Sequence, residues 1–499
     1  MSDPPHVVRP RLVSGSGERT QASERARGSS RTYPSVPPAS SDGGADGRHH
    51  IRRTLVLLEA NPVSIGIDAA VVANHHVVVR HAGAGGEAVE DFVVAPTLAG
   101  MEILTKRLSE WPGVMAVAEP TSMTWLPLSV ALHNAGGELA LVGNRHSARL
   151  RGAIAGKNKS DPIDAAVLSH AGELFALEPA RIPEPGELAL RRAVQRRGKA
   201  LIDSNRCLRR VISQARWAFP DVWNAFAGSK STAIAVLTRW PHLDQLARAR
   251  TSSITEVVAK HTRGVAQVEA RAERIRVAAR SWAEFWEGHL DLDALAWETS
   301  ELLSDLSSAE ARLERATEHA CLWWEQLWGD DHLLLSVPGM GRVIAPTVRA
   351  FLADGTQFAS AKEVQAYVGL NPSNWSSGQM ESPSRAITKE GPPVLRLAFY
   401  LAANVARSHD PQLAEFYRRL MVERGHCHSK ATCAVARKLV ARTWATLVSG
   451  RHYELRDLDG RAITAREAKA ISQSLDVPRG VRQRTRAQSA ASHRARLTR

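Results

Sequence analysis

An acidic residue interrupts an otherwise apolar run at residues 63–71. The run predicts a central β-strand, and Asp68 lies within it beside Ile67 and Ala69. Burying a carboxylate among apolar side chains is costly unless another group compensates its charge. A divalent metal ion is one such group, and a hydrogen-bond donor on a neighbouring loop is another. The fold must therefore supply Asp68 with a partner, and Asp68 alone does not say which.

The sequence around this strand has the pattern of an α/β domain. Apolar, β-branched runs predict further strands at residues 76–80, 88–94, 114–118 and 138–142. Amphipathic segments predict helices at residues 97–110 and 125–134 and from residue 161 onward. Ser160 is the expected N-cap of the last helix, and Pro162 suits its first turn. Hairpin strands followed by alternating helices and strands favour a mixed sheet covered by helices.

Three more acids accompany Asp68. Glu119 directly follows the strand at 114–118, at the carboxyl edge where sites of open α/β sheets gather. Asp161 and Asp164 are three residues apart, which places both on one face of a helix. An acidic first turn favoured by the helix dipole is the other interpretation of this pair. Together, the four carboxylates can converge on one or two Mg²⁺ or Mn²⁺ ions, because hard cations prefer oxygen ligands.

The chain also carries a large excess of positive charge. Its 499 residues include 65 Lys and Arg against 51 Asp and Glu, which gives a formal net charge of +14. Such an excess favours a polyanionic partner, because each phosphate that a cation neutralises releases a counterion. A basic tail on a neutral enzyme, or a general bias toward basic residues, would give the same total. Beside a carboxylate cluster, the excess indicates a nucleic acid as the substrate.

The carboxylate motifs resemble those of a known family. Residues 65–68, Glu119 and residues 159–165 together resemble the DEDD transposases of insertion-sequence family one-ten and the Piv-type DNA invertases. The N-terminal domain of these proteins is similar to the Holliday-junction resolvase RuvC, which has an RNase H-like α/β fold. The resemblance implies that fold here. It also implies that Asp68, Glu119, Asp161 and Asp164 are the four metal-binding and catalytic carboxylates, with Mg²⁺ or Mn²⁺ as the cofactor.

A second group of residues lies in the C-terminal half. Helical segments are broken at residues 338–341 and 369–372 and by the polar stretch at 373–393. That stretch contains Ser376-Ser377-Gly378, which by itself indicates only a polar turn. It resembles the loop of the family's transposase domain, where a Ser-Gly pair carries a nucleophilic serine. The resemblance implies that Ser377 is the nucleophile, with the adjacent Ser376 as the alternative.

A serine that attacks DNA needs cations near it to stabilise the developing charge. Arg385, Lys389 and Arg396 are the candidates for this nucleic-acid-binding role. The sequence departs from the usual family pattern in three places: Val71, Pro120-Thr121-Ser122 and Ser382-Pro383. None of them removes a metal ligand or the nucleophile.

The two groups are separated by a mainly helical region. A heptad pattern over residues 295–327 predicts either a coiled-coil hairpin or a dimer contact, and an ordinary bundle helix is the remaining interpretation. Its positions are Leu295, Thr299, Leu302, Leu306, Ala309, Leu313, Ala316, Ala320, Trp323 and Leu327. A strongly basic helix at residues 188–218 is the expected surface for a nucleic acid.

These patterns divide the chain into five parts. They are a disordered basic arm at 1–52, a RuvC-like DEDD domain at 53–180, a helical and coiled-coil region at 181–330, a serine-containing, mainly α-helical transposase domain at 331–452, and a basic tail at 453–499. The acid-free end of the tail predicts either a disordered segment that seeks phosphate or a merely solvated one. The four cysteines are too few for a disulfide framework, which fits the cytoplasm. We find no apolar run near the roughly 18 residues that span a bilayer.

The resemblance also implies partners. They are donor and target DNA, a structured guide RNA that bridges the two DNAs, and further copies of the chain in a dimer or tetramer. Two other classes of function stay open. A RuvC-like, structure-specific nuclease would need the carboxylates and not Ser377, and an inactive nucleic-acid-binding relic would need neither.

Overall fold

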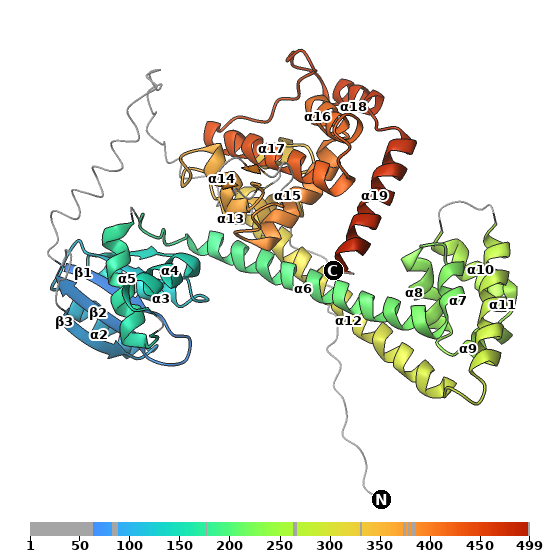
Figure 1. Cartoon of the computed structure of the whole chain (residues 1–499), viewed down its shortest axis with the longest axis horizontal. Helices are drawn as coiled ribbons and strands as arrows, with labels where there is room; N and C mark the ends of the chain where they lie inside the picture. Colours follow the sequence, from blue (N-terminus) through green and yellow to red (C-terminus); the bar gives the residue numbers. More distant parts are fainter. Residues whose placement is uncertain are drawn as a thin grey trace, which may run out of the picture. The chain divides into compact units, whose positions relative to one another are not determined.

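The structure is a computed structural model that describes most of the chain. The described residues are 63–81, 88–156, 158–175, 177–262, 267–329, 332–372, 376–377, 380–381 and 386–497. The expected arm at residues 1–52 lies outside them. The chain divides into two compact units, one up to Ile182 and the other from Pro183 onward. Figure 1 shows the elements of both.

A five-stranded mixed sheet forms the centre of the first unit. The strands are β1 (Val63–Asp68), β2 (His75–His81), β3 (Ala88–Val94), β4 (Met115–Ala118) and β5 (Glu138–Leu141). Their order across the sheet is β3-β2-β1-β4-β5. The first three strands pair antiparallel, whereas β4 pairs parallel with both β1 and β5. The predicted mixed sheet is therefore confirmed.

Helices cover both faces of this sheet. They are α2 (Leu98–Leu108), α3 (Trp125–Asn134), α4 (Asn144–Ile154) and α5 (Asp161–Leu174). Apolar side chains of α2 and α3 pack against Ile65 and Ile67 of β1 on one face. Leu168 and Ala171 of α5 pack against Val117 of β4 on the other face. The sequence predicted α2, α3 and α5, and it missed α4.

Helix α5 lies unusually close to β1, because a glycine faces it. A Cβ added at Gly66 would meet the carbonyl oxygen of Ala165 at 1.9 Å and the backbone nitrogen of Ser169 at 2.4 Å. One turn further along α5, the Ser64 hydroxyl donates a hydrogen bond to the carbonyl of Ser169. These contacts show that β1 and α5 run in opposite directions. The carboxyl end of β1 therefore meets the N-terminus of α5.

Two long helices form the frame of the second unit. They are α6 (Pro185–Ala218) and α12 (Leu292–Trp328), which lie side by side (Figure 1). Between them in sequence come α7 (Pro220–Ala225), α8 (Lys230–Arg239), α9 (Leu243–Arg248), α10 (Thr251–Lys260) and α11 (Val268–Trp286). These short helices share one core with the end of α6 and the start of α12.

The rest of the unit follows in sequence, and most of its helices pack around the opposite ends of the same pair. It consists of η1 (Leu333–Ser336), α13 (Ile344–Leu352), α14 (Ala361–Val368), β6 (Ser376–Ser377), β7 (Met380–Glu381), α15 (Pro393–Ala406), α16 (Pro411–Val422), α17 (His428–Ser449), α18 (Ala465–Ser474) and α19 (Arg479–Leu497). Together with the α/β unit, this confirms the predicted fold class. Among the described residues, no helix is both long and apolar enough to cross a membrane.

The predicted heptad positions of α12 are mostly buried, and α6 of the same chain covers them. Leu190 of α6 shares a core with Trp324, and Val211 of α6 shares a core with Leu295, so the two helices are antiparallel. At two turns the predicted position is wrong by one residue, because Leu303 and Trp324 are buried in place of Leu302 and Trp323. Supercoiling of this pair stays a prediction.

The basic tail contains two helices, and α19 occupies most of its acid-free end, so the alternative of a disordered segment is wrong for residues 479–497. Helix α19 contacts α16 and α17. Val477 and Thr485 are buried and Val481 packs against the core, at intervals of four residues. Three modest side chains at this spacing are enough to dock the segment, and the surrounding arginines hid the pattern in the sequence.

The contact at Gly66 yields a stability prediction. The Gly66→Ala substitution forces a methyl group into the backbone of α5, so we expect the first unit to lose about 1–3 kcal/mol of stability. Thermal and denaturant unfolding of the full chain measure this loss. Gly152→Ala in α4 is the matched control, because an added Cβ there meets no atom within 4 Å among the described residues. Equal unfolding midpoints for the two variants would contradict the close β1–α5 contact.

Candidate functional site

Asp68 and Glu119 stand at the ends of two neighbouring parallel strands. The register pairs Ile67 with Ala118, so Asp68 and Glu119 are the next residues of β1 and β4. Side chains alternate between the two faces of a strand. Ile67 and Ala118 belong to the core under α2 and α3, so Asp68 and Glu119 are directed to the other face, where α5 lies.

Asp161 and Asp164 lie in the first turn of α5. Ser160 is the N-cap residue, as predicted, although its side chain makes no capping hydrogen bond, and a proline follows Asp161. Because β1 and α5 are antiparallel, this turn meets the carboxyl end of β1. Buried Arg80 of β2 holds α5 in place, since its Nε donates to the Ser169 hydroxyl at 3.0 Å and its guanidinium pairs with Glu173 at 2.7 Å.

The other three acids all influence Asp68 electrostatically. Burial is the largest of the influences that raise the pKa of Asp68 to about 6. The charges of Asp164, Asp161 and Glu119 follow, in that order, and Lys159 opposes them. Each predicted acid thus acts on Asp68, although the four come from two strands and a helix. This mutual repulsion is the kind that a cation relieves.

Two of the four carboxylates have partners on α4. The Ser147 hydroxyl donates a hydrogen bond to Glu119. Nη1 of Arg151 lies 2.7 and 2.8 Å from the two carboxylate oxygens of Asp164. Sequence reasoning missed both residues because it missed their helix. Their spacing of four residues, on either side of the buried Leu150, is the signal that could have found them.

The donor set fits a hard divalent ion in its chemistry, since all four side chains offer carboxylate oxygens. Their arrangement is not a ready-made ligand cage. Within the described residues, no three His, Cys, Asp or Glu side chains form a group that could hold a metal ion. The contacts of Glu119 and Asp164 with α4 give a physical reason, because each carboxylate already accepts a hydrogen bond from that helix.

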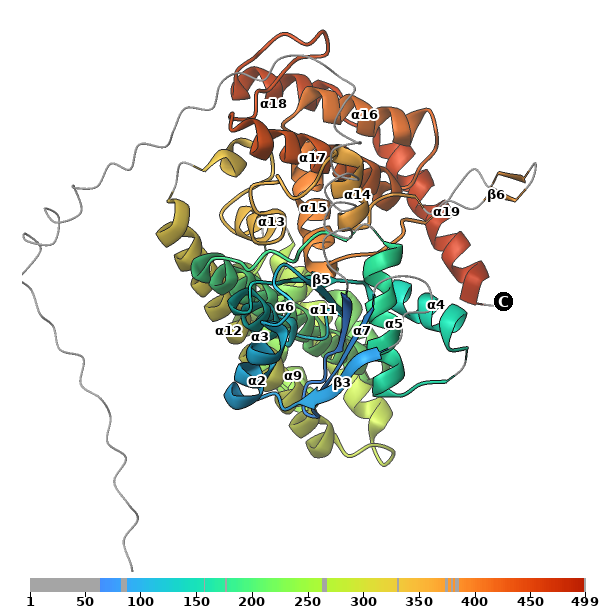
Figure 2. The same cartoon turned by 90° about the vertical axis from the view of Figure 1, so that its left-hand side faces the viewer.

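Ser377 belongs to the second unit, on a two-residue strand of a small hairpin. Strand β6 pairs antiparallel with β7, and Ser377 stands opposite Met380. Figure 2 shows β6 away from α14 and α15, the helices between which this excursion of the chain lies. The side chain of Ser377 and the whole of Arg385 lie outside the described residues.

The base of this excursion is held firmly. Pro372 forms a β-bridge with Ile387, and the backbone nitrogen of Thr388 donates to the carbonyl of Asn371 at 2.8 Å. Gly369 and Gly391 both have positive φ angles, and a Cβ on either would strike the opposite backbone within 2 Å. The two chain segments therefore cross too closely for any side chain.

Arg396 and Lys389 are the two candidate cations that the structure describes, and their surroundings differ. Nη1 of Arg396 donates to the carbonyls of Val368 and Glu390, each at 3.3 Å, so this guanidinium braces the glycine crossing. Lys389 adopts a positive φ of 57° and its side chain is exposed. Lys389 is thus the better placed of the two to meet a ligand from solvent.

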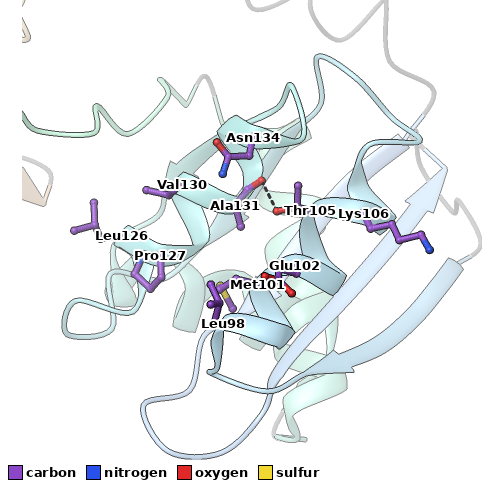
Figure 3. A pocket seen from close by; sticks show the side chains of 10 residues that line it. All are labelled: Leu98, Met101, Glu102, Thr105, Lys106, Leu126, Pro127, Val130, Ala131 and Asn134. Carbon is purple, nitrogen blue, oxygen red and sulfur yellow. Dashed lines mark hydrogen bonds between the residues drawn. The ribbon is translucent and has the colours of Figure 1, made fainter.

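A hollow elsewhere in the first unit is separate from the four carboxylates. It lies between α2 and α3 and has a volume of about 640 Å³. Its lining is mostly apolar and includes Leu98, Met101 and Val130 (Figure 3). The two helices cover the face of the sheet opposite α5, so the sheet separates this hollow from the carboxylates.

The raised pKa of Asp68 predicts a dependence of stability on pH. The pKa of Asp68 in the unfolded chain is about 3.9. The folded state binds the proton of Asp68 more tightly than the unfolded chain does. The protonated carboxyl therefore stabilises the fold fully below the pKa of the unfolded chain, and this stabilisation is lost as the pH rises through about 6, the pKa in the folded state. In buffer containing a chelator, we therefore expect Asp68→Asn to unfold at a higher temperature than wild type above pH 6. The difference should vanish near pH 4.

The control for this measurement is Glu138→Gln, which removes an exposed carboxylate from the neighbouring strand β5. Its effect should change little between pH 4 and pH 8. A constant difference between Asp68→Asn and wild type over this range would show that the four charges do not interact as described.

Two segments of the chain match known transposase families. Residues 65–220 match the family model DEDD_Tnp_IS110, described as a transposase. Residues 331–418 match the Transposase IS116/IS110/IS902 family. The first match contains all four carboxylates, and the second contains the serine hairpin.

Whole proteins give the same result. The 43.6 kDa protein of insertion element IS110 from Streptomyces coelicolor is 25% identical over 357 residues, which cover 69% of this chain and 84% of that protein. The 44.8 kDa protein of insertion element IS116 from Streptomyces clavuligerus is 25% identical over 321 residues, or 62% and 77% of the two chains. A pilin gene-inverting protein from Moraxella lacunata is 30% identical over 125 residues, 25% of this chain and 38% of that protein. Together with the two family models, these relatives show that the chain is similar to transposases of the IS116/IS110/IS902 family, and they support a DNA transposase.

Proposed function

We propose that this DNA transposase cuts and rejoins DNA with two sets of residues, a carboxylate metal site and a nucleophilic serine. The carboxylates are Asp68, Glu119, Asp161 and Asp164, and the nucleophile is Ser377. The observation that carries the proposal is the influence of three acids, distant in sequence, on the pKa of Asp68. Four like charges are kept together at a cost, and a function in binding a cation accounts for that cost.

The serine step is a transesterification. The Ser377 hydroxyl loses its proton as its Oγ bonds to the phosphorus of a DNA phosphodiester, and the deoxyribose oxygen leaves and takes up a proton. The DNA strand is then joined to the protein as a phosphoserine diester. One phosphodiester bond replaces another, so the bond energy needed for rejoining is conserved. Attack by the hydroxyl of another strand reverses the step and rejoins the DNA.

Mg²⁺, or Mn²⁺ in its place, would supply positive charge to the oxygens of the reacting phosphate when held by the four carboxylates. The chain's own cations act in the same direction. Lys389 presents an exposed ammonium group, Arg396 braces the base of the hairpin, and Arg385 is assigned to phosphate binding from its sequence position.

The partners follow from the same reaction. Donor and target DNA are the substrates, and we assign a structured guide RNA to the basic helix α6. Its exposed cations include Arg192, Arg196, Lys199, Arg206 and Arg210. Arg197 is used within the fold, since its Nε donates to the Thr317 hydroxyl at 3.0 Å. We further propose a dimer or tetramer that acts in the cytoplasm, with a RuvC-like DEDD domain at 53–180 and the serine domain at 331–452.

The serine is tested with Ser377→Ala. We expect covalent protein–DNA adducts and strand joining to fall by about three orders of magnitude or more, because the nucleophile is lost. The substrate is a duplex that carries the DNA flanking the gene of this chain, and denaturing gels detect the adduct. Ser376→Ala is the control and should retain most of the joining. If Ser377→Ala cuts DNA at the normal rate, the chain is a RuvC-like nuclease and the serine mechanism is wrong.

The carboxylates are tested with Asp161→Asn. Loss of one oxygen ligand should reduce cleavage dependent on Mg²⁺ by roughly a hundredfold. The measurement is cleavage of the same duplex over a range of Mg²⁺ concentrations, with Glu138→Gln as the control. Equal cleavage by Asp161→Asn and wild type would overturn the metal role of Asp161, whereas no cleavage by either at any Mg²⁺ concentration would favour the inactive relic.

A further inference from the structure

Helix α4 places a positive charge directly on one of the four carboxylates. Nη1 of Arg151 contacts both oxygens of Asp164, at 2.7 and 2.8 Å. The side chains of Arg151 and Asp164 are 23% and 17% exposed, so water screens this pair only in part. The contact is not a loose surface pair.

The second contact of α4 with the cluster is neutral. Ser147 lies four residues before Arg151, on the same face of the helix. Its hydroxyl donates to Glu119 and is itself 4% exposed. A hydroxyl group holds a carboxylate without opposing a cation, whereas a guanidinium group brings a full charge. Of the two residues, only Arg151 competes electrostatically with an ion.

A divalent ion bound to Asp164 would lie within about 2.0–2.6 Å of a carboxylate oxygen. Arg151 already lies in hydrogen-bond contact with both of these oxygens. Two cations on one carboxylate repel each other, so either one weakens the binding of the other. The guanidinium group also matches the geometry of a phosphate, which can accept the same pair of hydrogen bonds.

We propose that Arg151 competes with the divalent ion for Asp164, and that a DNA phosphate relieves this competition by binding Arg151. The inference rests on the proposed metal site and states what sets the affinity of that site for the divalent ion. The site would then bind its ion weakly without DNA and more tightly with DNA. Because binding linkage is reciprocal, the ion would strengthen DNA binding by the same factor.

The test measures Mn²⁺ binding to the full chain, using the paramagnetic resonance signal of free Mn²⁺. Wild type is compared with Arg151→Gln, each with and without a duplex of the element's flanking DNA. Without DNA, we expect Arg151→Gln to bind Mn²⁺ roughly tenfold more tightly than wild type, within the usual range of coupling between sites. DNA should raise the Mn²⁺ affinity of wild type by a similar factor and leave that of Arg151→Gln nearly unchanged.

Two further variants control for charge and for folding. Arg149→Gln removes the same charge from an exposed position of α4 and should bind Mn²⁺ like wild type. Arg151→Lys keeps a competing charge, so it should bind Mn²⁺ more weakly than Arg151→Gln. Unfolding midpoints of all variants, measured without metal, show whether the first unit remains folded. If Arg151 only held the fold together, its loss would leave Mn²⁺ binding unchanged or weaker, and this outcome would contradict the proposal.

Failure of this inference is distinguishable from failure of the metal site. If wild type binds Mn²⁺ more tightly than Asp161→Asn but Arg151→Gln binds it no more tightly than wild type, only the role of Arg151 is overturned. If wild type and Asp161→Asn bind Mn²⁺ equally, the carboxylate site itself is overturned, and the competition with it. Equal enhancement by DNA in wild type and Arg151→Gln would also overturn the proposed coupling.

Discussion

The close contact between β1 and α5 at Gly66 is the constraint on which the carboxylate site depends. The helix rests on the strand backbone with no side chain between them, and the antiparallel direction brings its first turn to the end of the strand. A bulkier residue at position 66 would lift α5 away from the sheet. The positions of Asp161 and Asp164 relative to Asp68 would change with it. Two residues without polar side chains, Gly66 and Ala165, thus set the geometry of the four carboxylates that we propose as the metal site.

The same geometry concentrates negative charge, and the surrounding chain responds to it. Lys159 lowers the pKa of Asp68, and Arg151 contacts Asp164 directly. These two cations do not balance the four acids, because burial and the other three carboxylates still raise the pKa of Asp68 to about 6. A site with residual repulsion retains an affinity for further positive charge. A site fully neutralised by its own arginines would have lost that affinity.

The sequence predicted most of this unit because its signals are local. Each strand is an apolar run, and each of the four acids interrupts such a run, directly follows one or stands in a first helical turn. Helix α4 was missed because Leu150 is the one buried apolar side chain among its described residues, so it shows little apolar periodicity. Its roles come from Ser147 and Arg151, whose partners Glu119 and Asp164 lie 28 and 13 residues away. Contacts of that kind are set by tertiary structure, so the local spacing of Ser147 and Arg151 points to a shared helix face without identifying their partners.

At the serine hairpin, the residues alone gave no functional signal. Ser376-Ser377-Gly378 has the composition of any polar turn, so only the resemblance singled it out. The structure adds a physical reason why a reactive group could stand there. The crossing of Gly369 and Gly391, braced by Arg396, fixes where the excursion begins and ends. A group beyond such a base stands outside the helical core while its point of attachment stays fixed. In the proposed mechanism, this would reduce the entropy lost when Ser377 is positioned for attack. Arg396 therefore contributes through the backbone it holds, and a phosphate would have to compete with two carbonyls for its Nη1.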